Sequence, residues 1–406
     1  MPELPEVETV ARDLRGLVRG ARIEGARCDW PPTIRSHSPD DFAAAISGRP
    51  IEGVGRRGKQ LLVWLGAPEV ASGSDARPLA PDAAVMTVHL KMTGQLFVVE
   101  PSTPVDRHVH LVLALDDGRE VRFRDIRKFG RIGLYRRDDA TGLPVEGEAV
   151  GVLARGAEPL ADDFTSRRFV ELLHRRRGRL KTLLLNQDFV AGVGNIYADE
   201  ALWMARLHPL RDASTVTPVE ARRLHAALRE VLAEAVERRG SSIDDYTAPE
   251  GDGSMQEHLG VYQRAGQPCL RCGRQIRRFV LGGRSTHFCP WCQRLPKEQR
   301  EAARRILDAG EAATGARSAR SMAAGSGPRR GPRWTELSGD GVLGRTAGEE
   351  AAADARRRRV EATRSAAATR RAAARAGGEP GATASGSATS TGKATSIDAA
   401  TAPEPG

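Results

Sequence analysis

The segment from residue 269 to residue 292, CLRCGRQIRRFVLGGRSTHFCPWC, contains two Cys-x2-Cys pairs with sixteen residues between them. This spacing is typical of a tetrahedral zinc site with four thiolate ligands, in which each pair lies on one tight turn. Because four thiolates leave no coordination position for water, we expect one structural Zn2+ and a β-hairpin between the pairs. The predicted zinc ligands are Cys269, Cys272, Cys289 and Cys292.

The rest of the composition favours zinc over the alternatives, two disulfides or four ordinary buried thiols. The N-terminus MPELPEVETV lacks the apolar core of a signal peptide, and no apolar run is long enough to span a bilayer. We therefore expect a cytoplasmic protein, in whose reducing compartment disulfides are rare. The formal net charge of +10 over 406 residues favours a polyanionic partner. Charge alone does not separate nucleic acid from an acidic membrane surface.

Helical signals dominate residues 163–240, on the N-terminal side of the cysteines. The clearest is Thr217-Pro218-Val219-Glu220, in which threonine can cap a helix, proline fits the first turn and glutamate completes a capping box. Gly240 marks the expected end of this helix. Its predicted buried stripe consists of Leu224, Leu228, Val231, Leu232 and Val236.

Short β-like runs divided by Gly, Pro and Asp turns fill residues 21–137. One amphipathic helix, ended by Gly20, precedes them. The stretch 70–82 is predicted as a surface loop, and residues beyond about 310 as a disordered tail because they contain almost no large apolar side chains. The first helix is expected to bury Val7, Val10, Ala11, Leu14, Leu17 and Val18; the clearest strands are Gln60 to Leu65, Val85 to Leu90, Leu111 to Leu115 and Glu120 to Arg124.

The extreme N-terminus carries a possible nucleophile. Removal of Met1 would leave Pro2 as a free secondary amine, and an α-amino group has a pKa of roughly 8, low enough for part of it to be unprotonated near neutrality. Glu3 beside it can act as a general acid if burial raises its pKa. The alternative interpretation is structural, because proline and glutamate are also common in the first turn of a helix.

Several motifs together resemble one family. MPELPEVETV, Gly58-Lys59-Gln60, Arg127-Lys128-Phe129-Gly130, the GVGNIY motif at 192–197 and the cysteine hairpin occur in the order found in formamidopyrimidine-DNA glycosylases, members of the bacterial Fpg/Nei family of DNA glycosylase/AP lyases. The resemblance covers about residues 2–294. It implies an α+β fold with an N-terminal helix plus β-sandwich domain, a helix-two-turn-helix domain, a C-terminal four-cysteine zinc hairpin and a disordered tail. The implied boundaries are 2–137 for the catalytic β-sandwich domain, 138–162 for a linker, 163–240 for the helix-two-turn-helix domain, 241–259 for a lesion-covering loop region, 260–294 for the zinc hairpin and 310–406 for the tail.

The resemblance also implies catalytic roles. Pro2 would displace the damaged base by attack at C1′, and Glu3 would protonate the sugar oxygen as the ring opens. Lys59 matches the family's lysine in β-elimination, and Arg284 matches the hairpin arginine associated with phosphate binding and δ-elimination. By residue type alone, Lys59 would be a solvated lysine before a strand and Arg284 an ordinary surface residue.

DNA contacts follow from the same resemblance, with damaged double-stranded DNA as the partner of a monomer that does not bind membranes. The glycines of the GVGNIY motif, followed by a helix that begins near Ile196, are expected to admit a phosphate. Met92 and Phe129 would otherwise be interpreted as core residues. The implied phosphate contacts are His108, Arg127, Arg176, Lys181 and Asn195; the implied gap fillers behind a flipped base are Met92, Arg127 and Phe129; and the implied lesion-recognition residue is Glu6.

Three functions remain open at this point. An enzyme for oxidised purines, 8-oxoguanine opposite cytosine in particular, is favoured by Leu4-Pro5-Glu6-Val7 and by the gap-filling trio. An endonuclease VIII-like enzyme for oxidised pyrimidines would share the same nucleophile and zinc hairpin. A non-catalytic DNA-binding protein should have lost a catalytic residue. Two positions that bear on lesion preference depart from the family pattern: GDGSM at 251–255 lacks the aromatic residue of many relatives, and Gln263 stands where glycine is usual.

Overall fold

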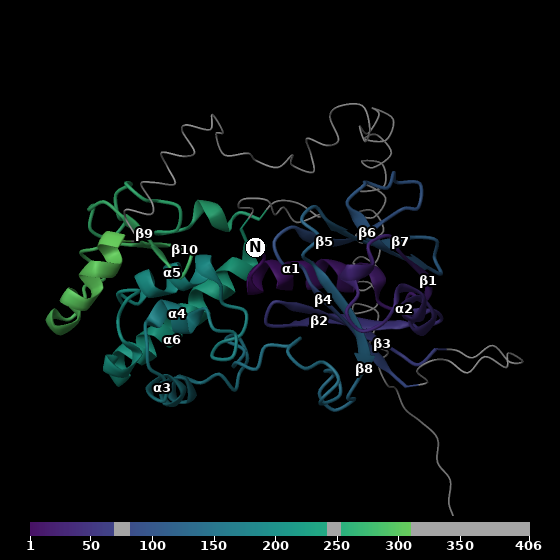
Figure 1. The fold of residues 1–406 in the computed structure, drawn as a ribbon, viewed down its shortest axis with the longest axis horizontal. Coiled ribbons are helices and arrows are strands. Elements are labelled where there is room, and N and C mark those ends of the chain that lie inside the picture. The colour runs from purple at the N-terminus through teal and green to yellow at the C-terminus, as the bar shows by residue number, and fades with distance from the viewer. Residues whose placement is uncertain (69–81, 242–252, 310–406) are drawn as a thin grey trace, which may run out of the picture. The chain divides into compact units, whose positions relative to one another are not determined.

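The computed structural model describes residues 1–68, 82–241 and 253–309. The predicted tail, the predicted loop at 70–82 apart from its last residue, and residues 242–252 lie outside the described residues. Within the described residues the predicted α+β fold is confirmed, with a β-sandwich, a helical domain and a four-cysteine hairpin (Figure 1).

The N-terminal half is a sandwich of two four-stranded antiparallel sheets, with strand orders β1-β6-β7-β5 and β2-β3-β4-β8. Residues from both sheets share one apolar core with helix α1 and the short helix α2. All four strands that the sequence singled out are present, and four more lie within the same predicted β-rich stretch of residues 21–137. The elements are α1 Leu4–Val18, β1 Ile23–Cys28, α2 Pro39–Ile46, β2 Ile51–Arg57, β3 Gln60–Leu65, β4 Ala84–His89, β5 Gly94–Val99, β6 Val109–Leu115, β7 Glu120–Asp125 and β8 Arg131–Arg136.

Helix α1 begins with a capping box. The side chain of Glu3 accepts from the amide of Glu6, and the side chain of Glu6 accepts from the amide of Glu3. Its predicted apolar face is buried from Val7 to Val18. Leu17 is the exception, because its side chain is 38% exposed. On a helical wheel Leu17 lies at the edge of the stripe, where the contact with the sheets ends.

The helical half contains α3 Ser166–His174, α4 Leu180–Leu184, α5 Asn195–Met204 and α6 Pro218–Glu237. The capping box of Thr217 and Glu220 is formed, and the predicted stripe of α6 is buried. The helix ends at Glu237, three residues before the predicted stop. Gly240 instead has a φ of +76° in the turn that follows, a conformation that favours glycine.

The zinc hairpin pairs β9 Arg277–Leu281 with β10 Arg284–Phe288 in antiparallel register. Gly282 and Gly283 connect the strands with positive φ at both positions, as a tight hairpin turn requires. Residues 297–309 form a further helix that the sequence did not predict. Among the described residues, no helix combines the length and apolar character needed to cross a membrane.

Salt bridges join the sandwich to the helical half. Arg56 of β2 binds Glu8 of α1 at 2.8 Å and Glu158, in the connection to the helical half, at 2.7 Å. Arg239, just after α6, binds Asp13 of α1 at 2.7 Å. Helix α1 therefore contacts the second half along its length, and its N-terminal end meets the start of α5.

Candidate active site

The first turn of α1 enters the helical half beside α5. The amide of Leu4 donates to the carbonyl of Gly192 at 3.0 Å. Pro2 is buried, and Met1 before it is 36% exposed. Removal of Met1 would convert the nitrogen of Pro2 from an amide into a free secondary amine.

Glu3 has its carboxylate against the N-terminus of α5. It is 2% exposed and accepts hydrogen bonds from the amides of Ile196 at 3.0 Å and Tyr197 at 3.4 Å. Burial raises the pKa of Glu3 above its ordinary value, although the positive charge of Lys59 opposes the shift. A raised pKa favours the protonated form of this carboxyl group next to Pro2, which is the form that a general acid needs.

The glycines before α5 make room for this arrangement. A Cβ on Gly194 would lie 2.2 Å from the carboxyl carbon of Glu3, and one on Gly192 would lie 2.7 Å from Leu4. The sequence indicated that these glycines and the helix N-terminus would admit a phosphate. In the structure the N-terminus of α5 binds the Glu3 carboxylate instead, because α1 packs there.

Lys59 lies in the turn between β2 and β3, after Gly58 at φ +57°. Its side chain is only 8% exposed, so the solvated lysine expected from residue type is wrong. Burial lowers the pKa of Lys59, the charge of Glu3 opposes this, and the charge of Arg284 adds to the lowering. Lys59, Glu3 and the exposed Arg284 at the hairpin tip are therefore close enough to interact electrostatically.

Glu6 is buried and its oxygens already have partners. It accepts from the hydroxyl of Tyr197 at 2.6 Å, the amide of Ser241 at 2.9 Å and the amide of Glu3 at 2.8 Å. Ser241 is the last described residue before 242–252, within the predicted lesion-covering region. Glu6 thus ties helix α1 to Ser241, where that predicted region begins.

Two turns of the sandwich carry the predicted gap fillers. Phe129 is 45% exposed and Met92 is half-buried, so the alternative interpretation of Phe129 as a core residue is wrong. The guanidinium carbon of Arg127 lies 5.0 Å from the centre of the Phe129 ring. The hydroxyl of Thr93 joins the turns, because it accepts from the Arg127 amide at 3.1 Å and donates to buried Asp125.

The remaining predicted DNA contacts differ in exposure. Arg176 is exposed and His108 is half-buried. The side-chain oxygen of Asn195 is buried with no hydrogen-bond partner among the described residues. Lys181 differs from the prediction, since its side chain is completely buried and pairs with Asp199 at 2.7 Å. A phosphate at the surface cannot reach its ammonium group in this arrangement.

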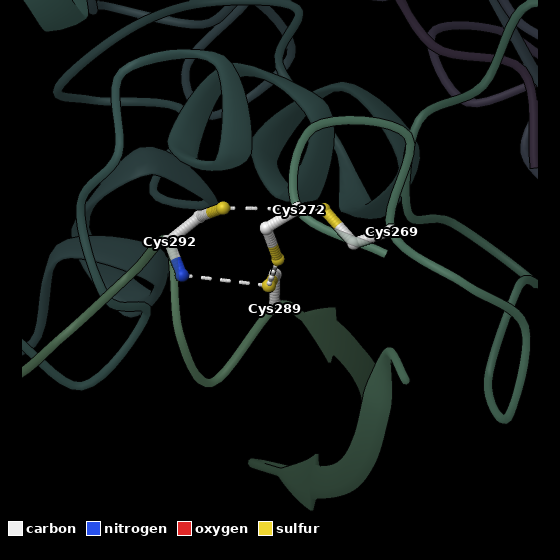
Figure 2. Close-up of side chains that lie close together, drawn as sticks. All are labelled: Cys269, Cys272, Cys289 and Cys292. Carbon is white, nitrogen blue, oxygen red and sulfur yellow. Dashed lines mark hydrogen bonds between the residues drawn. The ribbon is translucent and has the colours of Figure 1, made fainter. Parts of the chain in front are cut away.

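The four predicted zinc ligands converge (Figure 2). Their sulfur atoms all lie within 4.8 Å of one another, with Sγ of Cys272 3.4 Å from Cys289 and Sγ of Cys269 4.0 Å from Cys292. Tetrahedral zinc with Zn–S bonds of about 2.3 Å separates its sulfurs by about 3.8 Å, so the donor set fits the ion. With four thiolates, a structural Zn2+ is the metal that this cluster would hold.

Models of known protein families match the chain from its N-terminal half to the cysteine hairpin. The formamidopyrimidine-DNA glycosylase N-terminal domain matches residues 1–132, the H2TH domain of the same enzymes residues 155–247, and the zinc finger found in FPG and IleRS residues 266–295. A formamidopyrimidine-DNA glycosylase of Chloroflexus aurantiacus is 48% identical over 295 residues, which are 72% of this chain and 98% of the relative. This chain belongs to the formamidopyrimidine-DNA glycosylase family.

Solved structures of the family agree. The MutM (Fpg) protein of Thermus thermophilus is 43% identical with a TM-score of 0.60, covering 72% of this chain and 98% of that one. The Fpg (MutM) of Lactococcus lactis is 32% identical, with 72% and 100% covered. It was solved with DNA containing N7-benzyl-Fapy-dG, at a TM-score of 0.63, and with DNA containing an oxidised pyrimidine, at 0.62.

Two buried acids of this glycosylase were missed from sequence. Asp199 and Glu200 are adjacent on α5 and are buried. Glu200 accepts the amides of Gly260 at 2.7 Å, Val261 at 2.9 Å and Tyr262 at 2.7 Å. Glu200 thereby holds the start of the zinc hairpin segment. Neighbouring carboxylates on a helix carry no local signal for burial, because acidic residues are usually exposed.

The pH dependence of stability should reveal Glu200. Burial raises its pKa from 4.5 to about 7. Between these values the folded protein holds a proton that the unfolded chain has lost, so this group's contribution to the free energy of unfolding decreases as the pH rises through the window. The decrease amounts to at most about 3 kcal/mol.

Denaturant titrations across the window should show that the free energy of unfolding of Glu200→Gln depends less steeply on pH. Glu257→Gln, which removes an exposed carboxylate, should keep the slope of the unmodified protein, and an equal slope in all three would refute the assignment.

Zinc content tests the cysteine cluster. The purified full chain should contain one zinc ion, and Cys272→Ser should lose most of it together with the capacity to nick abasic DNA, because the hairpin that carries Arg284 depends on the metal for its fold. Elemental analysis and a nicking assay measure both. Cys28→Ser is the matched control, since Cys28 lies in β1 outside the cluster, and it should retain zinc. Full nicking activity in a zinc-free protein would contradict this expectation.

Proposed function

We propose that this chain removes oxidised purines, ring-opened formamidopyrimidines among them, from DNA and then cleaves the strand at the abasic site. It is a bifunctional DNA glycosylase and AP lyase of the formamidopyrimidine-DNA glycosylase family, and it spans nearly the full length of its relatives. The observation that carries the chemical proposal is the buried carboxyl group of Glu3, the residue after Pro2, which accepts hydrogen bonds from the N-terminus of α5. We expect the protein to act as a monomer on damaged double-stranded DNA in the cytoplasm, associated with the nucleoid.

Base removal begins at Pro2. Its nitrogen lone pair attacks C1′, the C1′–N bond to the base breaks with its electron pair, and the proton lost by the amine balances the one taken by the departing base. Glu3 then donates its proton to the sugar oxygen as the C1′–O bond breaks. The nitrogen lone pair forms an iminium, which is the Schiff base that joins enzyme to DNA.

Strand cleavage follows from the iminium. Loss of the C2′ proton sends an electron pair towards the iminium, and the C3′–O bond breaks with its pair on the departing phosphate. Lys59 is the proposed proton carrier, because burial lowers its pKa and favours the neutral amine that a base requires. A second elimination removes the C4′ proton and expels the 5′ phosphate, whose charge Arg284 would stabilise.

DNA binding is proposed for the remaining matched residues. His108, Arg127, Arg176 and Asn195 would hold phosphates around the extruded nucleotide, positioning the DNA without specifying its sequence. Met92, Arg127 and Phe129 would fill the space that the flipped base leaves, and this offsets the few kcal/mol of lost stacking. For Glu6 we propose an indirect part in lesion recognition, through its bond to Ser241. Lys181 is not among the proposed phosphate ligands.

Borohydride trapping tests the nucleophile. Reduction should link the protein covalently to abasic duplex DNA, and Pro2→Gly should lower the trapped fraction by at least about tenfold, because the secondary amine that favours iminium formation is gone. Pro5→Gly, one turn further along α1, is the matched control and should still be trapped. Mass spectrometry of the active protein should find Met1 removed and the amine unmodified. If the intact protein gives no trapped complex, it is a DNA-binding protein without catalysis.

Lesion preference distinguishes the purine enzyme from the endonuclease VIII-like alternative. Duplexes with 8-oxoguanine opposite cytosine should be cleaved faster than duplexes with thymine glycol in single-turnover assays. We expect a preference of at least about tenfold, the usual scale for a specificity set by pocket contacts. Faster cleavage of thymine glycol would overturn the purine assignment while leaving the lyase chemistry intact.

A further inference from the structure

A fully buried ion pair lies behind the tip of the zinc hairpin. Lys181 of α4 and Asp199 of α5 are both completely buried and are 2.7 Å apart. The ammonium group also donates to the carbonyl of Ser285 at 2.8 Å and to the hydroxyl of Thr286 at 3.0 Å. An ammonium has three N–H donors, and its three oxygen neighbours here match that number.

Asp199 extends the same network along the strand. Its second oxygen accepts the amide of His287 at 2.8 Å and lies 3.3 Å from Nδ1 of that histidine. Three consecutive residues of β10, from Ser285 to His287, are therefore bound to this one pair. Arg284 directly precedes them.

Among the described residues, the two glycines at the tip of the hairpin have open space around them. A Cβ at Gly282 or Gly283 would meet no atom within 4 Å, so the turn itself projects from the protein. The zinc ligand nearest to Arg284 along the chain is Cys289. It lies five residues away, which is about 17 Å along an extended strand. Zinc fixes the base of the hairpin but cannot by itself set the position of the arginine. The buried pair reaches the residue next to Arg284, because Lys181 donates to the carbonyl of Ser285.

We propose that Lys181 and Asp199 are positioning residues that hold Arg284 at the site of the second elimination, and so set how much of the product undergoes δ-elimination. The proposal rests on the proposed function. It also explains why a lysine that lies beyond the reach of DNA is buried here at all, since a buried charge is tolerated when it is paired and hydrogen-bonded. The rival role for Lys181 is a direct phosphate contact.

A double variant separates these roles. Lys181→Met combined with Asp199→Asn removes both charges together, so no unpaired charge is left in the interior, and the asparagine can still accept the amide of His287. On abasic duplex DNA labelled at both ends, the ratio of δ- to β-elimination product should fall about tenfold, the scale expected when a catalytic group is displaced slightly. The trapped fraction and the Kd for DNA should change much less than this ratio.

Epistasis supplies the decisive readout. Arg284→Gln should lower the same ratio, and adding the double variant to it should cause no further fall, because both changes act through one group. Gln293→Met is the matched structural control. It removes buried contacts at the hairpin base, to Cys289 at 2.8 Å and to Leu207 at 2.9 Å, and should leave the ratio unchanged when zinc is retained.

Four outcomes would overturn the proposal: an unchanged ratio in the zinc-loaded double variant, an effect that adds to that of Arg284→Gln, an equal fall with Gln293→Met, or a weakened Kd that accounts for the whole loss. The last of these would favour the phosphate contact. Failure of the proposed function is distinguishable, because the unmodified protein would then show no borohydride trapping.

Discussion

The arrangement depends on one buried carboxyl group. Glu3 caps its own helix and at the same time occupies the N-terminus of α5, so a single side chain joins the first turn of the sandwich half to the helical half. The helix dipole and two amides favour the ionised form, while burial favours the protonated form more strongly, and the balance raises the pKa. The packing that joins the two halves therefore also raises the pKa of the carboxyl group that we propose as the general acid.

Around Glu3, groups of opposite charge are set close together in the interior. The charge of Glu3 raises the pKa of both Lys59 and Lys181, against the larger effect of their burial, and the charge of Arg284 lowers both. Burial of Glu3, Lys59 and Lys181 strengthens these interactions, because charges interact more strongly where water is excluded. The negative charge of Glu3 offsets part of the repulsion that Arg284 exerts on the two lysines.

The two supports of the zinc hairpin have different physical characters. The metal gathers residues whose positions along the chain already match its geometry, so it specifies the base of the hairpin locally. The Lys181–Asp199 pair is a long-range contact that exists only when α4, α5 and β10 have packed. Glu200 adds a third attachment, at the segment that leads into the hairpin.

Local sequence was sufficient for the features that depend on residues close together along the chain. The cysteine spacing, the Thr217 capping box and the apolar run from Gln60 to Leu65 each contain their own physical cause, and each appears as predicted. Packing determined which of these parts meet. Glu3 binds an amide 193 residues away, and Lys181 is buried although lysine is ordinarily exposed. Burial and charge environment depend on neighbours brought together by the fold, and no local pattern records them.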